Sequence, residues 1–470
     1  MTYLLYTLGV LAIAFGIGVS IALHELGHLI PAKRFGVKVT QYMIGFGPTV
    51  ASWRRGETEY GIKAIPLGGY VRMIGMLPPQ TPAPDGQPER LRSGTTGRFA
   101  MLAEQARRDA LDEVTPGEEH RVFYRLSTPK KILVMLGGPL MNLVIAAVLL
   151  TGYVTLYGVL DDRQPTGAAI AGVSTCVPAT VTSGTAPGTS GGSGGSGSAG
   201  AGCQGRPAAP AYAAGLRPGD RIVGIDGRTV STPSDISAIV RPNAGRSMPV
   251  QVLRDGQPVT LTVTPVATQL PKLDAAGKLV LDASGKAVTV QGGFLGTTTR
   301  PTFATVRQPL SEAPTYIGQA MAGTAGVMLR IPEKMVGVWN AAFGDSERDL
   351  NGPISVFGVG RVAGEKAGGE ITGSLMDDID VLPFLVQLLA GLNMALFVFN
   401  LIPLMPLDGG QIAGALWEGL RRTVARVTGR PDPGPVDVAR ALPLAYAVSV
   451  VLIGMSALLI YADLVKPVRF

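Results

Sequence analysis

Charged side chains are scarce in this chain of 470 residues: Asp, Glu, Lys and Arg make up 16% of it, whereas hydrophobic residues make up 46%. Globular proteins usually have about 25% charged residues. The apolar excess is concentrated in four uncharged runs, at 1–23, 132–160, 381–407 and 441–462. Each run is long enough for the roughly 20 apolar residues with which a helix crosses a bilayer. This composition excludes a fully soluble enzyme and predicts a membrane protein.

Cysteine and clustered basic residues are also lacking. The chain has two cysteines, Cys176 and Cys203, whose spacing does not match a zinc knuckle. The formal net charge is +7, but there is no compact Lys/Arg tract with interleaved aromatic residues. We therefore expect no nucleic-acid partner, and we expect the lipid bilayer as the surrounding medium.

Basic residues beside the uncharged runs predict the orientation of the chain. They are Lys33, Arg34, Lys38, Lys130, Lys131, Arg421, Arg422 and Arg426. By the positive-inside rule the segments 31–131 and 409–440 are cytoplasmic, and both termini and 161–380 face outward. A signal peptide is an alternative for the first run, but residues 1–23 have no basic start and no small-residue cleavage site follows. We interpret 1–31 as a retained transmembrane helix.

The cytoplasmic part before the second run has two regions of different composition. Residues 36–73 alternate apolar and polar side chains between turns such as Gly45-Phe46-Gly47-Pro48. This pattern predicts short strands in membrane-associated β-hairpins. Residues 78–120 are rich in proline, glycine and charge, which predicts a cytoplasmic loop.

The outward segment contains a small domain with distinctive motifs. The run Ala213-Ala214-Gly215-Leu216-Arg217-Pro218-Gly219-Asp220 is followed by Ile225-Asp226-Gly227 and by a predicted helix near 233–240. These motifs resemble those of bacterial PDZ domains, which implies a PDZ-like α+β domain over 168–267 with a peptide or protein ligand. A tract of glycine and serine at 183–202 interrupts it.

Cys176 and Cys203 lie on either side of this Gly/Ser insertion. Two interpretations stay open: a disulfide that holds the ends of the insertion together, or two free thiols in a flexible linker. Residues 268–380 follow as an extracytoplasmic connection. An amphipathic helix is expected over 311–340, on the outer membrane surface.

Two of the three histidines flank a glutamate in His24-Glu25-Leu26-Gly27-His28, at the cytoplasmic end of the first run. Histidines four residues apart on a helix project from one face and can hold one metal ion. Zinc lowers the pKa of a bound water to about 7, so a neighbouring glutamate can take its proton. The alternative is a chance motif on a buried helix. Ionisable groups beside a bilayer cost free energy and persist mainly when paired, ligated or functional, so we favour a metal site.

A catalytic zinc site usually has three protein ligands. His120 lies in a charged loop, whereas Asp408 follows the uncharged run 381–407 on the same predicted side of the membrane as the HExxH motif. Prolines before Asp408 and glycines after it predict a break in the helix there. An N-cap of the next helix is the alternative role for Asp408, but its combination with HExxH favours a third metal ligand.

Together, HELGH, the N-x-x-P-x-x-P-L-D-G-G run from Asn400 to Gly410 and the interposed PDZ-like domain resemble the bacterial site-2 proteases, a family of intramembrane zinc metalloproteases. The resemblance extends to Gly138-Pro139-Leu140-Met141-Asn142. It implies one Zn²⁺ per chain and the following site residues: His24, His28 and Asp408 as metal ligands, Glu25 as catalytic base, and Asn400, Asn142, Gly45, Phe46 and Gly47 in substrate binding.

The same resemblance, with the charge pattern, implies a polytopic α-helical protein of the bacterial plasma membrane. Its four transmembrane helices are 1–31, 132–160, 381–407 and 441–462, accompanied by the cytoplasmic-side β-hairpin region and the extracytoplasmic PDZ-like α+β domain. The active site is expected near the cytoplasmic side. The implied substrates are single-pass membrane proteins such as anti-sigma factors or remnant signal peptides, cleaved in regulated intramembrane proteolysis.

Two other functions are alternatives. A non-enzymatic membrane scaffold with a structural metal site would need a fourth ligand, often Cys, and neither cysteine is predicted on the cytoplasmic side. A metal or proton transporter usually has repeated helix sets and more polar residues at mid-membrane. Both alternatives fit the chain less well than a protease.

Overall fold

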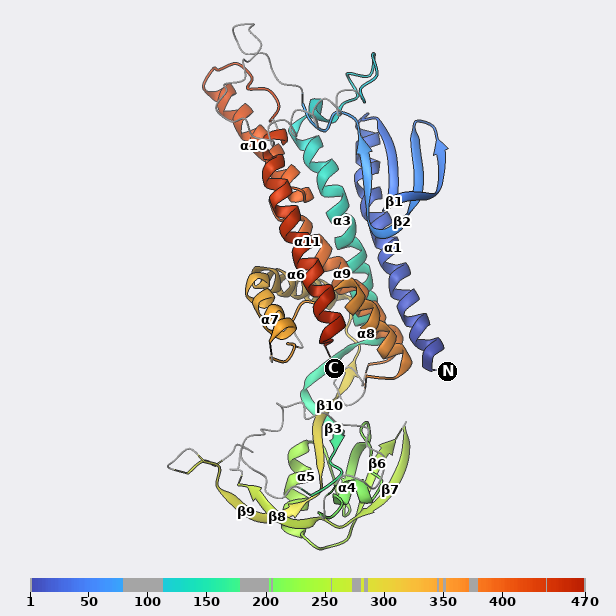
Figure 1. Cartoon of the computed structure of the whole chain (residues 1–470), viewed down its shortest axis with the longest axis vertical. Coiled ribbons are helices and arrows are strands. Elements are labelled where there is room, and N and C mark those ends of the chain that lie inside the picture. Colours follow the sequence, from blue (N-terminus) through green and yellow to red (C-terminus); the bar gives the residue numbers. More distant parts are fainter. Residues whose placement is uncertain are drawn as a thin grey trace. The chain divides into compact units, whose positions relative to one another are not determined.

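The computed structural model describes residues 2–78, 113–177, 203, 206–254, 256–272, 280–282, 286–344, 346–349, 352–371, 379–436 and 438–468 (Figure 1). The 183–202 insertion and most of the expected 78–120 loop lie outside these residues. The chain divides into two compact units. We call Met1–Thr155, Pro309–Gly368 and Leu385–Arg469 the membrane unit, and Leu156–Gln308, Gly369–Phe384 and Phe470 the sheet unit.

Four helices in the described part of the chain are long and apolar enough to cross a membrane. They are α1 (Thr2–Arg34), α3 (Thr128–Gly152, continued by the π-helical turn Tyr153–Tyr157), α9 (Val381–Asn400) and α11 (Leu442–Val465). A helix satisfies its own backbone hydrogen bonds, which lipid cannot do. The prediction of four helices able to span a membrane is confirmed. The third ends at Asn400, seven residues before the end of the uncharged run, in a turn that contains Pro403 and Pro406.

Helices α1 and α3 lie side by side along much of their length (Figure 1). They approach most closely at Gly27 and Gly137, where a Cβ atom on either residue would clash with the carbonyl oxygen of the other. Small residues allow such close packing of helices in membranes. This crossing brings the middle of α3 against the HExxH turn of α1.

The predicted hairpins are formed by two long, bent strands, β1 (Val39–Arg55) and β2 (Thr58–Met73). They pair with each other in more than one place. Tyr42 lies opposite both Tyr60 and Val71, so the first half of β1 is flanked by both halves of β2. The Tyr42 hydroxyl donates a 2.7 Å hydrogen bond to the Ala22 carbonyl of α1. This bond fixes the sheet beside the helix that carries the histidines.

Among the described residues, the other α-helices of the membrane unit are α6 (Ala313–Leu329), α7 (Ile331–Phe343), α8 (Val356–Gly368) and α10 (Asp408–Val427). The single helix expected over 311–340 is therefore wrong, since the structure divides it at Arg330. The physical reason is Pro332, which has no N–H for a helix interior but fits the first turn of a new helix. Helix α10 is held on α3 by a buried ion pair, in which Lys131 Nζ lies 2.8 Å from both carboxylate oxygens of Glu418.

The sheet unit contains a six-stranded sheet in the order β10-β3-β4-β6-β7, with β5 paired to β4. Its strands are β3 (Val159–Val173), β4 (Arg221–Ile225), β5 (Arg228–Thr229), β6 (Met248–Arg254), β7 (Gln257–Val263) and β10 (Thr297–Val306). Helices α4 (Pro210–Ala213) and α5 (Pro233–Val240) accompany it, and β8 (Val266–Pro271) pairs with β9 (Thr289–Phe294). Ile170, Ile222 and Val250, from three adjacent strands, belong to one buried core.

This sheet extends beyond the expected 168–267 domain. Strand β10 comes from the segment interpreted as a connection, and it pairs antiparallel with β3 from Thr297↔Val173 to Val306↔Val159. The expected boundary at 267 is therefore too early. The strand was missed because a pairing across more than 120 residues has no local signal.

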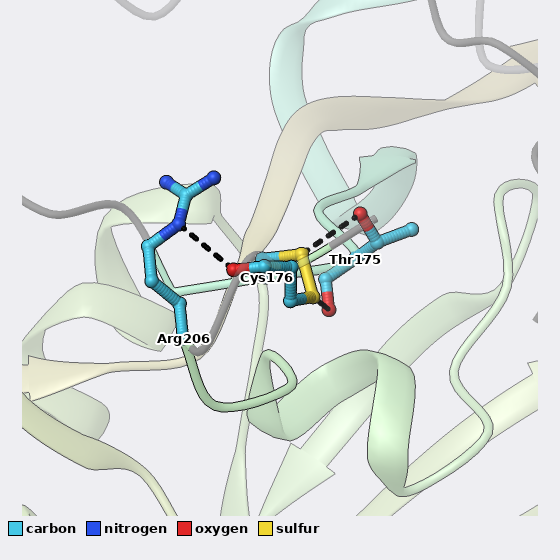
Figure 2. Close-up of a disulfide and its surroundings, with 4 residues drawn as sticks. Thr175, Cys176 and Arg206 are labelled. Carbon is cyan, nitrogen blue, oxygen red and sulfur yellow. Dashed lines mark hydrogen bonds between the residues drawn. A yellow bond between two sulfur atoms is a disulfide. The ribbon is translucent and has the colours of Figure 1, made fainter. Parts of the chain in front are cut away.

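Cys176 and Cys203 form a disulfide in the structure, with their Cα atoms 5.6 Å apart (Figure 2). Backbone pairing begins beside it: Val177 N–H donates to Pro207, and Ala209 N–H donates to Thr175. The two ends of the interrupted segment thus enter and leave the domain at one point, and the disulfide holds them there.

Candidate metal centre

Helix α1 positions both histidines. His24 and His28 are one helical turn apart, so their rings share a face and lie with centroids 5.0 Å apart. His28 is buried, and its Nδ1 lies 2.8 Å from the carbonyl oxygen of Val134 on α3. Gly138 makes room for the ring, because a Cβ there would clash with His28 Nε2. The ring of His28 is therefore fixed from both sides.

The turn after α9 delivers Asp408. The chain folds back so closely that a Cβ on Gly409 would clash with the Ile402 carbonyl, and one on Gly410 would lie 2.7 Å from Met405 N. Only glycine fits such an approach of backbone to backbone. Asp408 is the first residue of α10, whose N-cap is Leu407 with no side-chain cap. The alternative role of Asp408 as N-cap is therefore wrong, and its carboxylate faces the histidines.

Three ligand atoms converge in this place. His24 Nε2 and His28 Nε2 are 3.3 Å apart, and Asp408 Oδ2 lies 3.4 Å from the first and 3.5 Å from the second. Donor atoms about 2.0 to 2.2 Å from a tetrahedral zinc ion are about 3.3 to 3.6 Å apart. The triangle therefore fits three ligands of one such ion. In the described residues these three side chains form the group of His, Cys, Asp and Glu able to hold a metal.

The electrostatics of the cluster favour the ionised form of Asp408. Burial raises the pKa of its carboxyl group, but hydrogen bonds from His24 and His28 outweigh this and lower the pKa to about 2. A carboxylate that is ionised at neutral pH is the form that binds metal.

Glu25 is buried beside the same cluster and interacts electrostatically with His28, His24 and Asp408. Its side chain lies against the backbone of β2, because a Cβ on Gly69 would be 2.8 Å from Glu25 Cγ. The sheet therefore reaches the HExxH turn at Gly69. Sequence reasoning missed this contact, for which the Gly68-Gly69 pair was the available signal.

Asn142 contacts the cluster directly. It is buried on α3, and its Nδ2 lies 3.0 Å from His24 Nδ1, whereas its buried Oδ1 has no hydrogen-bond partner in the described part of the chain. Asn400 ends α9 half-buried, and its side chain makes no hydrogen bond among the described residues. The structure thus brings Asn142 to the ligands, whereas Asn400 has no side-chain partner within the described ranges.

Gly45, Phe46 and Gly47 form a bend in β1. Both glycines have positive φ, 93° and 82°, and Lys63 Nζ donates to the Gly47 carbonyl. Phe46 is 45% exposed and stacks on Tyr70 of β2 at 6.4 Å. The three residues lie on the sheet, and among the described residues they make no hydrogen bond to the metal cluster.

A pair of helical histidines and an aspartate from a distant turn, with a glutamate beside them, is an arrangement that fits a metallopeptidase with membrane-spanning helices. The model of peptidase family M50 matches residues 12–430, so the chain belongs to this family, and its resemblance to the site-2 proteases is confirmed. The zinc metalloprotease Rip1 of Mycobacterium tuberculosis H37Rv is 32% identical over 471 residues, 99% of each chain. Rip1 of Mycolicibacterium smegmatis is 31% identical over 99% of each chain. The zinc metalloprotease RasP of Geobacillus kaustophilus is 25% identical over 86% of this chain and 88% of its own.

Proposed function

We propose that this protein is an intramembrane zinc metalloprotease that hydrolyses peptide bonds within or near the transmembrane segments of other membrane proteins. The observation that carries the proposal is the triangle of His24 Nε2, His28 Nε2 and Asp408 Oδ2, whose sides match the spacing of ligands around zinc. Membership of peptidase family M50 and the names of the Rip1 and RasP relatives agree with it.

His24, His28 and Asp408 would hold the zinc ion. When bound, zinc polarises the scissile carbonyl and lowers the pKa of water. Glu25 lies next to the first ligand in the sequence and is buried beside all three. Its carboxylate takes a proton from the attacking water and returns it to the leaving amine.

Two contacts set the tautomers of the histidines. His28 donates Nδ1–H to the Val134 carbonyl, which leaves the Nε2 lone pair for the metal. For His24 the same tautomer requires an acceptor at Nδ1. A 180° rotation of the Asn142 side-chain amide supplies this acceptor, because Oδ1 then takes the place of Nδ2, 3.0 Å from His24 Nδ1. Asn142 thus orients His24 from α3.

The sheet offers a place for the unwound substrate. Unwinding exposes backbone groups that lipid cannot satisfy, and an extended peptide can pair with a free strand edge. The segment beginning at Gly69 pairs with β1 on one side and reaches Glu25. We assign substrate pairing to this edge, with Phe46 on the bend and the amide of Asn400 as further contacts. Substrates with helix-breaking residues near the cleaved bond are cleaved faster, since they unwind at lower cost.

We assign the protein to the bacterial plasma membrane, and the positive-inside distribution supports an orientation with the metal centre towards the cytoplasm. The sheet unit, as a PDZ-like domain, is extracytoplasmic and binds a peptide or protein ligand. Single-pass membrane proteins, such as anti-sigma factors or remnant signal peptides, are the substrate class. Cleavage of such proteins is regulated intramembrane proteolysis.

The first test is zinc content of the purified protein. Wild type should carry about one zinc per chain, and Asp408→Ala should lose most of it, because two ligands bind zinc more weakly than three. His120→Ala is the matched control, since it removes an exposed histidine outside the cluster. Full retention in Asp408→Ala would contradict the third ligand. Cleavage of a model transmembrane substrate by wild type but not by Asp408→Ala would then establish the activity.

A further inference from the structure

The face of α1 that carries His24 and His28 extends one further helical turn towards the N-terminus. Ser20 lies four residues before His24, as His24 lies four residues before His28, so the three side chains share a face. Ser20 is 3% exposed, and its hydroxyl donates a 2.9 Å hydrogen bond to the Gly16 carbonyl. The oxygen of Ser20 therefore remains available as an acceptor.

Asn393 of α9 uses that acceptor. It is fully buried, and its Nδ2 donates to Ser20 Oγ and to the Leu389 carbonyl, both at 2.9 Å. Apolar contacts accompany this bond, such as the packing of Leu389 against Gly16. The bond from Asn393 to Ser20 thus joins α1 to α9 inside the apolar span.

Helix α9 leads into the metal centre. Asn400 lies seven residues after Asn393 and so falls on the same face of the helix. Beyond Asn400 the turn packs against the start of α10, with Gly409 in contact with the backbone of Leu401 and Ile402. A shift or rotation of α9 would therefore move both the amide of Asn400 and the carboxylate of Asp408.

From this geometry we propose that Asn393 and Ser20 are positioning residues for the metal centre. Their hydrogen bond sets the position of α9 on the ligand face of α1, and through the 401–407 turn it sets Asp408 against His24 and His28. The inference rests on the proposed metal site. It assigns a task to a buried polar pair that neither binds the metal nor touches the reacting atoms.

The test is a double-mutant cycle on zinc affinity, measured with the full-length protein in lipid nanodiscs by competition with a chromogenic chelator. The variants are Ser20→Ala, Asn393→Leu and the double variant. The control is Ser449→Ala, because Ser449 makes the same kind of bond, to the Ala445 carbonyl of its own helix α11. Each single variant should weaken zinc binding roughly three- to twentyfold, the range expected for one interhelical hydrogen bond in a membrane.

The zinc affinity of the double variant should be no lower than that of the single variant with the lower affinity, because both changes remove the same hydrogen bond. Losses that add in the double variant would overturn the proposal, as would zinc affinity that stays at the wild-type value while the melting temperature falls. A wild-type protein that binds no zinc would remove this inference together with the metal site. A wild type that binds zinc and shows the cycle, but cleaves no membrane substrate, would contradict the protease function alone.

Discussion

The metal centre and the disulfide end of the sheet unit both bring distant residues together, but different forces do so. At the metal centre, side chains from α1, α3 and α10 meet through helix packing and a few buried hydrogen bonds. In the sheet unit, Cys176 and Cys203 are joined covalently, next to an apolar core that is already formed by strands. We therefore expect the polar contacts of the first region to affect function, and the disulfide of the second region to affect stability alone.

The largest effect is expected from Glu25→Gln. The amide cannot accept a proton from water, so turnover of a membrane substrate should fall about 10²- to 10⁴-fold. Zinc content should stay near that of wild type, since Glu25 is not one of the three converging ligands. The measurement is the single-turnover cleavage rate with zinc analysed in the same sample, and Glu119→Gln, at an exposed glutamate, is the control. Activity close to wild type would remove the assigned role.

The second largest effect is expected from the buried ion pair between Lys131 and Glu418. Glu418→Ala leaves the Lys131 charge buried without its partner, which should destabilise the membrane unit by about 3 to 5 kcal/mol. Replacing both residues by methionine should cost much less, because no unpaired charge remains. Thermal unfolding in detergent compares the two. Equal losses in both variants would mean that packing, and not the ion pair, stabilises α10 on α3.

The disulfide is expected to contribute stability without affecting the metal centre. Its residues are 27 positions apart, and closing a loop of that length should stabilise the sheet unit by about 3 to 4 kcal/mol. Cys176→Ser should therefore lower the unfolding temperature of the sheet unit, while zinc content remains unchanged. Mass mapping under non-reducing conditions is the accompanying check, and two free thiols in the wild type would contradict the pairing.

The smallest effect concerns a half-buried ion pair of the membrane unit. Two hydrogen bonds from Arg121, at 2.7 and 2.8 Å, lower the pKa of Glu57. A carboxyl group whose pKa is lower in the folded state stabilises the fold at pH values above its pKa in the unfolded state. This stabilisation is lost as the pH falls through the pKa of the folded state. Glu57→Gln should therefore cost about 0.2 to 1 kcal/mol at pH 7 and nothing once the carboxyl is protonated. Unfolding measured between pH 7 and pH 3 checks this, and a loss that persists at pH 3 would point to packing.

The sequence predicted those features that depend on composition or on close spacing. Uncharged runs located the four spanning helices, and the helical period placed His24 and His28 on one face. The motif around Asp408 was visible because glycines follow it, and the structure uses Gly409 for a close backbone approach. These features can be predicted from sequence patterns because lipid and helix geometry allow few other structures.

Features set by long-range pairing were not predictable. The carbonyl that receives a hydrogen bond from His28 belongs to Val134, and a backbone acceptor leaves no mark on residue identity. The return of β10 to the edge of β3 depends on tertiary pairing between remote segments. The contact of Gly69 with Glu25 likewise requires the sheet to be folded against α1.

The disulfide between Cys176 and Cys203 also has a practical use. With its two ends held 5.6 Å apart, the intervening chain can change length without pulling on the sheet, because the entropy of loop closure rises only slowly with length. Sites where a chain leaves and returns at one point tolerate inserted domains well. An affinity tag or fluorescent protein can therefore be inserted between the two cysteines, giving a labelled protein in which the strands of the sheet unit and the metal-centre residues keep their native sequences.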